Sequence, residues 1–360
     1  MERAYTLEGG RLLAQGTYGC VFDPPLRCNG KKIIRAHSKG ALGKITEPVD
    51  FLAEKEAAEV LGSLPVASKY YILPDLSSIC YPTKKQTDPQ VSLCKPIKLK
   101  SLDSFVQFEM PYGGNTLYQR MSDSSFKSPA AFFQVVQELL EAGAYMAAKS
   151  FVHYDIQNTN LVLDENNHIR LIDFGQSFHI KTFTKENLAM KIKVYIPEYN
   201  GEAPESTVIS GVLDGVPARV AIRDLVRGKP SLQLADSLLG LRAKDQERDL
   251  QHFWKTSHAV KNKDFVEFFK LYWPGFDGFM IGANILQCMY RFIMIPSFTD
   301  SQEWKDKSGR LYELLRGLLQ ASPRKRIDAI EALYIYDPTN AWFSEYGVSW
   351  MTAKAAQRHV

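Results

Sequence analysis

The sequence predicts an α+β fold with two lobes, of which the first is smaller and mainly β and the second is larger and mainly helical. Its 360 residues, 45% of them hydrophobic, can bury one large core or two joined lobes. Two strand-like runs meet at a glycine turn near the start of the chain, and helical apolar spacing recurs in its later part. We expect residues 1–110 to form the first lobe and residues 111–360 to form the second.

The composition argues against several classes of protein. A net charge of +4 is small for this length and no long block of lysine or arginine occurs, so nucleic-acid binding has little support. The first residues lack an apolar signal core. The longest apolar stretch, residues 278–295, contains Asn284, Gln287 and Arg291, so we expect a buried helix and no membrane span.

The five cysteines are odd in number and lack the spacing of a zinc site. We expect them to be small core residues or surface thiols in a reducing, cytoplasmic compartment.

Residues 11–22 read as two strands that meet at a glycine turn, residues 16–19. Small residues at such a turn let backbone amides approach phosphate oxygens, although most glycine turns are only structural. Residues 104–117 predict a strand that ends in a Gly-Gly hinge, and residues 128–149 predict a long amphipathic helix.

Residues 50–61 predict a helix with one buried side, because good helix formers and apolar residues follow helical spacing there. Glu54 borders the buried side and can hold a lysine side chain inward; Glu56 is the alternative if the register differs. Lys44, in a short strand-like run before the helix, competes with Lys32 for this role. We favour Lys44, because Lys32 more readily flanks an exposed loop.

A hairpin carries the most informative residues of the chain. Two apolar runs, residues 160–163 and 169–172, flank the turn-forming D-E-N-N and read as paired strands. Asp155 precedes the first strand and Asp173 follows the second, so Asp155, Asn160 and Asp173 should meet at one end of the hairpin. These three side chains could supply a base for a hydroxyl proton and two oxygen ligands for Mg²⁺, which is the set of groups that a phosphoryl-transfer site needs.

These segments, in this order, resemble the eukaryotic-type protein kinase family over most of the chain. The motifs are H-x-D-x₄-N at residues 153–160, D-F-G at 173–175, A-P-E at 203–205, D-x-aromatic at 277–279, and a late arginine, Arg326. The resemblance implies a bilobal kinase-like fold, ATP and Mg²⁺ as cofactors, and protein substrates. It also implies that Arg326 pairs with the glutamate of A-P-E in a buried ion pair.

The run G-T-Y-G-C-V-F-D-P-P-L-R-C, followed by a strand lysine close to the helix glutamate, is similar to serine/threonine kinases of large nucleocytoplasmic DNA viruses. This similarity implies a kinase of the host cytoplasm or the virion that acts on virion or host proteins. The sequence leaves its oligomeric state open.

The resemblance assigns roles to individual residues. Asp155 would accept or orient the proton of the substrate hydroxyl. Asn160 and Asp173 would bind Mg²⁺, and Lys44, held by Glu54, would neutralise the α- and β-phosphates. The other nucleotide-binding positions are Ala14, Gly16, Gly19 and Val21 in the glycine turn, Glu109 and Met110 at the hinge, and Asn115 near the ribose.

Three single residues depart from the family pattern. Gln157 stands where serine/threonine kinases carry a lysine that stabilises the transferred phosphoryl group, so the catalytic set lacks a charge there. Tyr154 replaces the arginine that receives an activation-loop phosphate in many members, so activity should not require that phosphate. Pro111 falls where members donate a backbone N–H to adenine, unless the hinge is shifted and Tyr112 donates instead.

Residues 206–275 are far longer than the family's connection between the same motifs, and we expect a small folded insert. Residues 230–241 and 264–273 have helical apolar spacing, whereas residues 211–222 read as strand-like or turn-like. The insert should lie beside the peptide-binding surface and influence substrate choice or docking.

Two other functions share parts of this pattern. Small-molecule phosphotransferases of the aminoglycoside or choline kinase type carry the same hairpin motif. A pseudokinase would keep the fold as a binding module. Gln157, and Ala14 in place of the first glycine of the family's glycine-rich turn, favour it to some degree.

Overall fold

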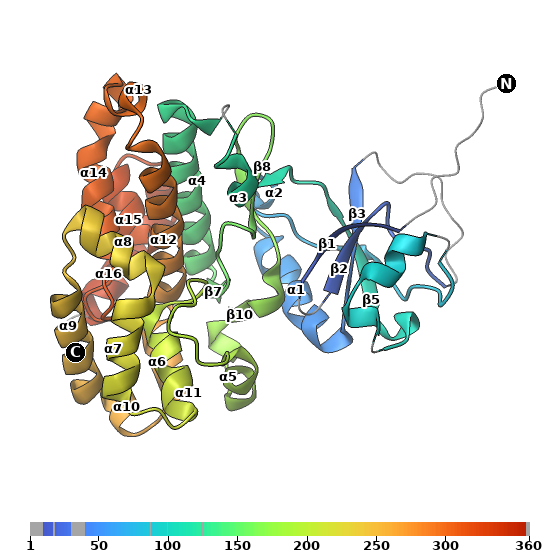
Figure 1. Cartoon of the computed structure of the whole chain (residues 1–360), viewed down its shortest axis with the longest axis horizontal. Coiled ribbons are helices and arrows are strands. Elements are labelled where there is room, and N and C mark those ends of the chain that lie inside the picture. The colour runs from blue at the N-terminus through green and yellow to red at the C-terminus, as the bar shows by residue number, and fades with distance from the viewer. Residues whose placement is uncertain are drawn as a thin grey trace. The chain divides into compact units, whose positions relative to one another are not determined.

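The computed structural model describes residues 10–16, 19–29, 40–86, 88–98, 100–123 and 126–357. The chain forms two compact units (Figure 1). The smaller unit is Met1–Gly114 with Ile172–Gln176, and the larger is Asn115–Leu171 with Ser177–Val360. Strands dominate the first unit and helices the second, which confirms the predicted α+β class.

An antiparallel sheet of five strands, in the order β1-β2-β3-β5-β4, forms the centre of the smaller unit. The strands are β1 (Arg11–Gln15), β2 (Gly19–Asp23), β3 (Ala41–Thr46), β4 (Asp75–Cys80) and β5 (Val106–Pro111). The helices are α1 (Pro48–Leu61) and α2 (Ala67–Tyr70), and 3-10 turns span Pro89–Leu93, Pro96–Lys98, Leu102–Ser104 and Phe174–Gln176. The predicted strands around the glycine turn and the strand that carries Lys44 are thus confirmed.

Helix α1 packs one face on the sheet, as its sequence pattern predicts. The helix begins two residues earlier than expected because Pro48 is accommodated in its first turn. Phe51 and Glu54 lie on its buried face, and the ring of Phe51 lies 5.4 Å from that of Phe108 on β5. The buried position of Glu54 follows from this packing.

Four of the five cysteines form disulfides, so the expectation of unpaired thiols is wrong for them. Cys20 on β2 is joined to Cys94, and Cys28 is joined to Cys80 on β4, whereas Cys288 is free and buried. The bonded partners are 74 and 52 residues apart in sequence. The cysteine content therefore no longer supports a reducing compartment.

The larger unit is mainly helical. Its short strands form two sheets, one of β6 (Asn115–Thr116), β8 (Leu161–Leu163) and β9 (Ile169–Leu171), the other of β7 (Phe151–Val152) and β10 (Phe178–His179). Helices of its first half are α3 (Leu117–Arg120), α4 (Pro129–Ala148), α5 (Lys185–Lys191), α6 (Pro204–Leu213), α7 (Ala218–Gly228), α8 (Pro230–Leu239) and α9 (Ala243–Thr256). The later helices are α10 (His258–Lys261), α11 (Phe265–Tyr272), α12 (Pro274–Phe292), α13 (Pro296–Thr299), α14 (Gln302–Leu318), α15 (Ala329–Tyr336) and α16 (Val348–Gln357).

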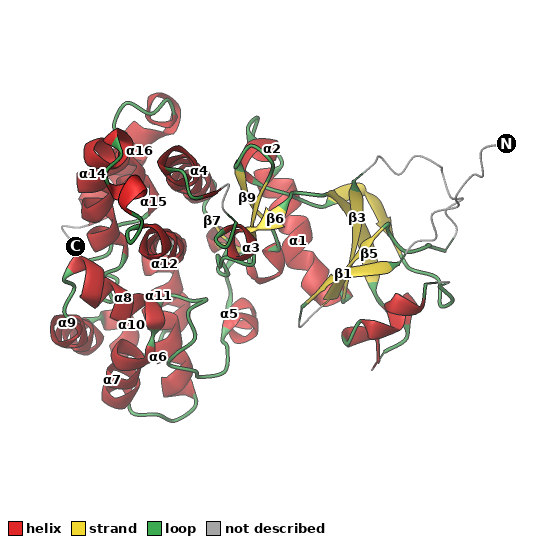
Figure 2. Cartoon of the chain, turned by 45° about the horizontal axis from the view of Figure 1, so that its top comes forward, coloured by secondary structure: helices red, strands yellow, loops and turns green. Residues whose placement is uncertain are grey.

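Helix α12 is the central helix of this unit and packs against α4, α8, α14 and α15 (Figure 2). It covers most of the apolar stretch that the sequence predicts to be a buried helix. Within the described residues, no helix has the length and apolarity needed to cross a membrane.

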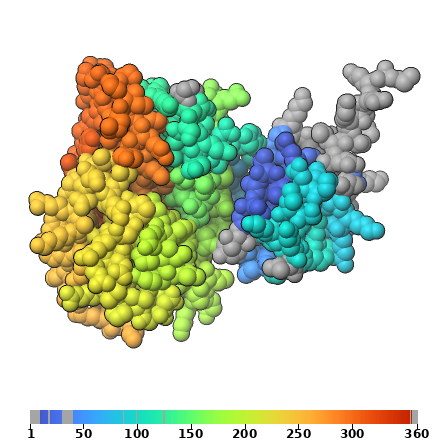
Figure 3. Space-filling view, viewed as in Figure 1, coloured from blue at the N-terminus to red at the C-terminus, as the bar shows by residue number. Residues whose placement is uncertain are grey.

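The predicted insert is helical throughout most of its length and forms a continuous part of the larger unit's surface (Figure 3). Helices α8 and α11 confirm the two predicted helical segments. The strand-like expectation for residues 211–222 is wrong: α6 continues to Leu213, residues 214–217 form a turn, and α7 begins at Ala218. Gly211 allows this packing, because a Cβ there would come within 2.9 Å of the Tyr195 ring.

Candidate active site

The smaller unit gathers three charged residues of the predicted site. Lys44 on β3 forms an ion pair with Glu54 on α1, and its Nζ lies 2.8 Å from Oδ1 of Asp173. The side chains of Lys44 and Glu54 are almost fully buried, whereas that of Asp173 is 48% exposed. The structure therefore pairs Lys44 with Glu54; the alternative lysine, Lys32, lies outside the described residues.

Two carboxylates keep Lys44 charged despite its burial. Burial alone lowers the pKa of a lysine, but the charges of Asp173 and Glu54 outweigh it and hold the pKa of Lys44 above its ordinary value. The site thus keeps a fixed positive charge next to the exposed carboxylate of Asp173.

Asp173 adopts a backbone conformation that L-residues rarely adopt. Its φ is 65°, and the next three residues form a 3-10 turn that packs against α1. Phe174 anchors this turn, because its buried ring meets that of Tyr71 edge to face at 6.1 Å. Such strained residues concentrate at functional sites.

The two described glycines of the turn between β1 and β2 have different surroundings. The Gly16 N–H donates to the carbonyl of Gly19 over 2.9 Å, and a Cβ at Gly16 would meet open space. A Cβ at Gly19 would come within 2.0 Å of the Ile45 carbonyl oxygen on β3, so close strand packing requires that glycine. Ala14 pairs with Val21 across the two strands, after an irregularity in the register.

At the predicted hinge, the proline lacks a backbone donor and that of Tyr112 is already bonded. Glu109 and Met110 lie on β5 opposite Gly43 and Leu42 of β3, and Pro111 has no N–H. The N–H of Tyr112, the alternative donor, is bonded to the Gly40 carbonyl over 2.8 Å. Asn115 lies in the larger unit, where it begins β6 and pairs with Leu163.

The larger unit contains the predicted hairpin around D-E-N-N. Leu161 pairs with Leu171 in the register of β8 and β9. The turn closes with Asn167 at φ 63°, a conformation that asparagine tolerates. Asn160 directly precedes β8, and Asp173 follows β9 by two residues. The convergence of Asp173 with Asn160 stays a prediction, because Asp173 belongs to the smaller unit.

Asp155 lies before this hairpin with 14% of its side chain exposed. Asn160 donates from Nδ2 to Oδ2 of Asp155 over 2.8 Å, and Gln157 donates to the same oxygen over 3.2 Å. The other oxygen, Oδ1, accepts from Lys193 over 3.0 Å and from the Tyr199 hydroxyl over 3.4 Å. The structure thus brings Asp155, Asn160 and Gln157 together and fixes the orientation of the carboxylate.

Helix α12 holds the loop that carries Asp155. Its Asp277 accepts the backbone N–H groups of His153 and Tyr154 over 2.8 and 2.9 Å. Farther along, Asn284 donates to the Ile156 carbonyl over 3.0 Å. Asp277 and Asn284 of this helix therefore hold the loop, and the side chain of His153 is fully buried.

Tyr154 fills its position with a buried ring. Its φ is 63°, its hydroxyl donates to Ser206 Oγ over 2.9 Å, and its ring lies 5.7 Å from that of Phe276. Burial raises the pKa of Tyr154 well above its ordinary value, so the hydroxyl stays neutral. Tyr154 is therefore held by ring contacts and by one hydrogen bond, and carries no charge.

The predicted pair between Glu205 and Arg326 is confirmed. Arg326 binds both carboxylate oxygens of Glu205, at 2.8 and 2.7 Å, and neither side chain is exposed. Arg326 also donates to the carbonyls of Gln320, Ala321 and Gly275. The pair joins the start of α6 to the segment before α15.

Sequence reasoning missed two lysines of the larger unit, Lys193 and Lys229. Lys193 contacts Asp155 directly, as described above. Lys229 at the start of α8 is fully buried and donates to the carbonyls of Tyr199 and Glu202. Burial lowers the pKa of Lys229 to about 8. Both lysines lie outside the motifs that the sequence analysis singled out, so nothing in their local sequence marked them as parts of the site.

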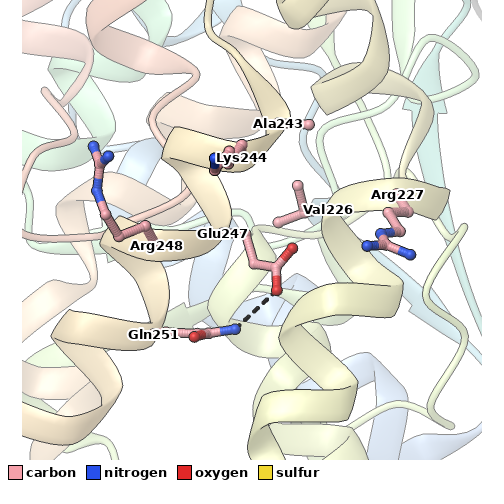
Figure 4. Close-up of a pocket in the computed structure, with 7 residues that line it drawn as sticks. All are labelled: Val226, Arg227, Ala243, Lys244, Glu247, Arg248 and Gln251. Carbon is pink, nitrogen blue, oxygen red and sulfur yellow. Dashed lines mark hydrogen bonds between the residues drawn. The ribbon is translucent and has the colours of Figure 1, made fainter.

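A separate pocket lies between α7 and α9 in the insert (Figure 4). Its cavity volume is about 560 Å³, and Glu247 accepts a hydrogen bond from Gln251 at its edge. Three basic side chains, Arg227, Lys244 and Arg248, line it, and none of the predicted site residues does.

Comparisons with known proteins agree with this geometry. Residues 90–210 match the family model described as protein kinase domain. Aurora kinase C of Mus musculus is 25% identical over 124 residues, which are 34% of this chain and 44% of that protein. The phosphorylase b kinase gamma catalytic chain, liver/testis isoform, of Homo sapiens is 24% identical over 232 residues, 64% of this chain and 45% of the relative. Serine/threonine-protein kinase ppk8 of Schizosaccharomyces pombe is 38% identical over 69 residues, 19% of this chain and 13% of the relative.

The matched family region extends from before β5 to within α6, and therefore includes the hairpin and A-P-E. The chain spans less than half the length of each of these relatives. The matches thus show that residues 90–210 are similar to a protein kinase domain.

Proposed function

We propose that this chain is an ATP- and Mg²⁺-dependent protein kinase that transfers the γ-phosphoryl group to protein hydroxyls, serine or threonine rather than tyrosine. The observation that carries the proposal is the orientation of Asp155, fixed by Asn160 on the hairpin. The ion pair of Lys44 and Glu54 next to Asp173 supports it from the smaller unit. The kinase relatives favour protein substrates, and ppk8 favours serine or threonine.

The residues present fit a magnesium-bound nucleotide. Asn160 uses its amide nitrogen toward Asp155, so its carbonyl oxygen would serve as the ligand, and Asp173 would add its half-exposed carboxylate. Within the described residues, no cluster of three or more His, Cys, Asp or Glu side chains is arranged to hold a metal. Mg²⁺ does not need one, since one or two protein oxygens with phosphate oxygens and water suffice. When bound, Mg²⁺ would neutralise charge on the phosphates.

The chain's own residues then have distinct tasks. Asp155 orients the substrate hydroxyl and accepts its proton, a contribution of about 10²- to 10⁴-fold in rate for such bases. Lys44 neutralises the α- and β-phosphates, and Glu54 keeps Lys44 extended toward them. Ala14, Gly16, Gly19 and Val21 cover the phosphates, and Glu109, Met110 and Asn115 border the adenosine.

The resemblance to kinases of large DNA viruses leads to a narrower proposal. Such a kinase would act on virion or host proteins in the host cytoplasm or the particle. Only the run from Gly16 to Cys28 and the spacing of the lysine and glutamate support this step.

A pseudokinase is the second candidate, because Asp155 already accepts four hydrogen-bond donors and Gln157 brings no charge. A ligand that binds only the folded state raises the melting temperature, so millimolar Mg·ATP should stabilise either candidate, whereas only an enzyme transfers phosphate. A rise in melting temperature with Mg·ATP, without phosphate transfer to any substrate, would indicate the pseudokinase.

The test of the proposal is transfer of labelled phosphate from ATP to generic protein substrates, compared with a panel of aminoglycosides, sugars and amino alcohols. We expect incorporation into serine or threonine of the proteins and none into the small molecules. The reverse pattern would identify a small-molecule phosphotransferase.

A further inference from the structure

The carboxylate of Asp155 contacts a cation that the catalytic loop itself does not provide. Lys193 lies 3.0 Å from Oδ1 of Asp155, although the two residues are 38 positions apart in sequence. It follows α5 in the segment between D-F-G and A-P-E. The loop position that sequence comparison would assign to a cation holds Gln157, whose amide donates to the other oxygen, Oδ2.

Lys193 is held in this place by its surroundings. Its ammonium group lies 4.9 Å from the centre of the Tyr199 ring and 5.9 Å from that of Tyr154. Its side chain is only 21% exposed. Burial alone lowers the pKa of Lys193, but the charge and hydrogen bond of Asp155, together with Tyr199 and Glu202, outweigh it, and the pKa lies above its ordinary value. The side chain is therefore a positioned, permanently charged donor.

The segment on which Lys193 lies is tied down at both sides. The backbone N–H of Tyr195 donates to Asp214 in the turn after α6 over 3.3 Å. The carbonyl of Tyr199 accepts from buried Lys229 of the insert. The insert thus fixes the path of the chain that presents both Lys193 and Tyr199 to Asp155.

We propose that Lys193 is a catalytic residue that supplies, from the segment before A-P-E, the positive charge that Gln157 does not provide. The inference rests on the kinase function proposed above. A substrate hydroxyl must lie within about 2.6 to 3.2 Å of the Asp155 carboxylate to give up its proton. A cation bonded to that same carboxylate is therefore within reach of the phosphoryl oxygens that the hydroxyl attacks.

The step that Lys193 assists is the transfer itself. The substrate hydroxyl oxygen forms a bond to the γ-phosphorus, the bond from that phosphorus to the β,γ-bridging oxygen breaks, and ADP leaves with the electron pair. The hydroxyl proton passes to Asp155. Lys193 keeps its proton and donates hydrogen bonds to the oxygens of the transferred group, where charge-assisted bonds are roughly twice as strong as neutral ones.

The test compares Lys193→Ala with Lys193→Arg, with the rescue variant Gln157→Lys/Lys193→Ala, and with Lys185→Ala, an exposed lysine on the same segment. Turnover and KM for ATP are measured by labelled phosphate transfer, and melting temperatures verify folding. We expect Lys193→Ala to lower kcat by about 10²- to 10³-fold, as for loss of one charge-stabilising donor, with little change in KM for ATP. Arginine should retain most activity, the rescue variant should regain at least about tenfold, and Lys185→Ala should match wild type.

The outcomes distinguish failure of the proposed role of Lys193 from failure of the proposed kinase function. Unchanged kcat in Lys193→Ala would overturn the role of Lys193, and so would a rise in kcat, which would show that Lys193 blocks Asp155. A loss of kcat without rescue by Gln157→Lys would reduce Lys193 to a structural contact and overturn the catalytic role as well. If wild-type protein shows no transfer that depends on Asp155, the kinase function itself fails, together with the inference that depends on it.

Discussion

Replacing Arg326 by methionine should destabilise the larger unit strongly. The change leaves the carboxylate of Glu205 buried and without the partner that binds both its oxygens, at 2.8 and 2.7 Å. Because neither side chain is exposed, solvent cannot compensate. Removing one member of such a buried pair costs about 3 to 5 kcal/mol in the free energy of unfolding.

The pair can be separated from its surroundings by a double-mutant cycle. Glu205→Leu leaves Arg326 with three carbonyl acceptors, so we expect a smaller loss than for Arg326→Met. The double variant removes both charges, and replacing a buried pair by apolar groups is often close to neutral. We expect a coupling free energy of about 2 kcal/mol or more between the two sites.

Equilibrium unfolding in urea, followed by tryptophan fluorescence, measures these free energies. The signal reports on the larger unit alone, because all five tryptophans lie there: Trp254, Trp273, Trp304, Trp342 and Trp350. Arg324→Met is the matched control, since Arg324 is exposed on the same segment and only faces the Phe253 ring, a contact worth about 0.5 to 1 kcal/mol. A loss below about 1 kcal/mol in Arg326→Met, or strictly additive losses, would refute the reasoning.

Three further predictions concern other parts of the chain. Above pH 8 the native Lys229 loses its proton while the unfolded chain keeps it up to pH 10.5, so the free energy of unfolding of the wild type should gain roughly 3 kcal/mol relative to that of Lys229→Met across this window; a constant difference between the two proteins would contradict the lowered pKa. Alkylation of the unfolded, unreduced protein should add one group, at Cys288, and alkylation after reduction should add five; more than one group before reduction would contradict the pairing. Replacing the cysteines of either disulfide by serine should lower the free energy of unfolding by roughly 4 kcal/mol. Pro111→Ala restores a hinge donor and should raise ATP affinity by up to about tenfold in equilibrium binding, the worth of one neutral hydrogen bond; unchanged or weaker binding would argue against this hinge position.

The sequence was most informative where local spacing determines structure. The hairpin between Asn160 and Asp173 depends on two apolar runs and a turn, and the buried face of α1 depends on helical periodicity. The pair of Glu205 and Arg326 is distant in sequence, and it was predictable only because the family pattern supplies both positions.

Long-range arrangement was much less predictable. The disulfide partners of Cys20 and Cys28 depend on how loops of 74 and 52 residues fold back, which no local pattern records. Residues 211–222 contain β-branched residues, but packing of α6 against Tyr195 and Ala221 overrides that local preference. The position of Lys193 next to Asp155 depends on the irregular path of the segment after α5, where no periodicity exists to guide a prediction.

The central claim is that Asp155 performs phosphoryl transfer, and Asp155→Asn tests it most directly. The substitution keeps the size of the side chain and removes its ability to take the hydroxyl proton. In a phosphate-transfer assay with a melting-temperature control, we expect kcat to fall by about 10²-fold or more while the protein stays folded and still binds Mg·ATP. Turnover equal to that of wild type would contradict the account.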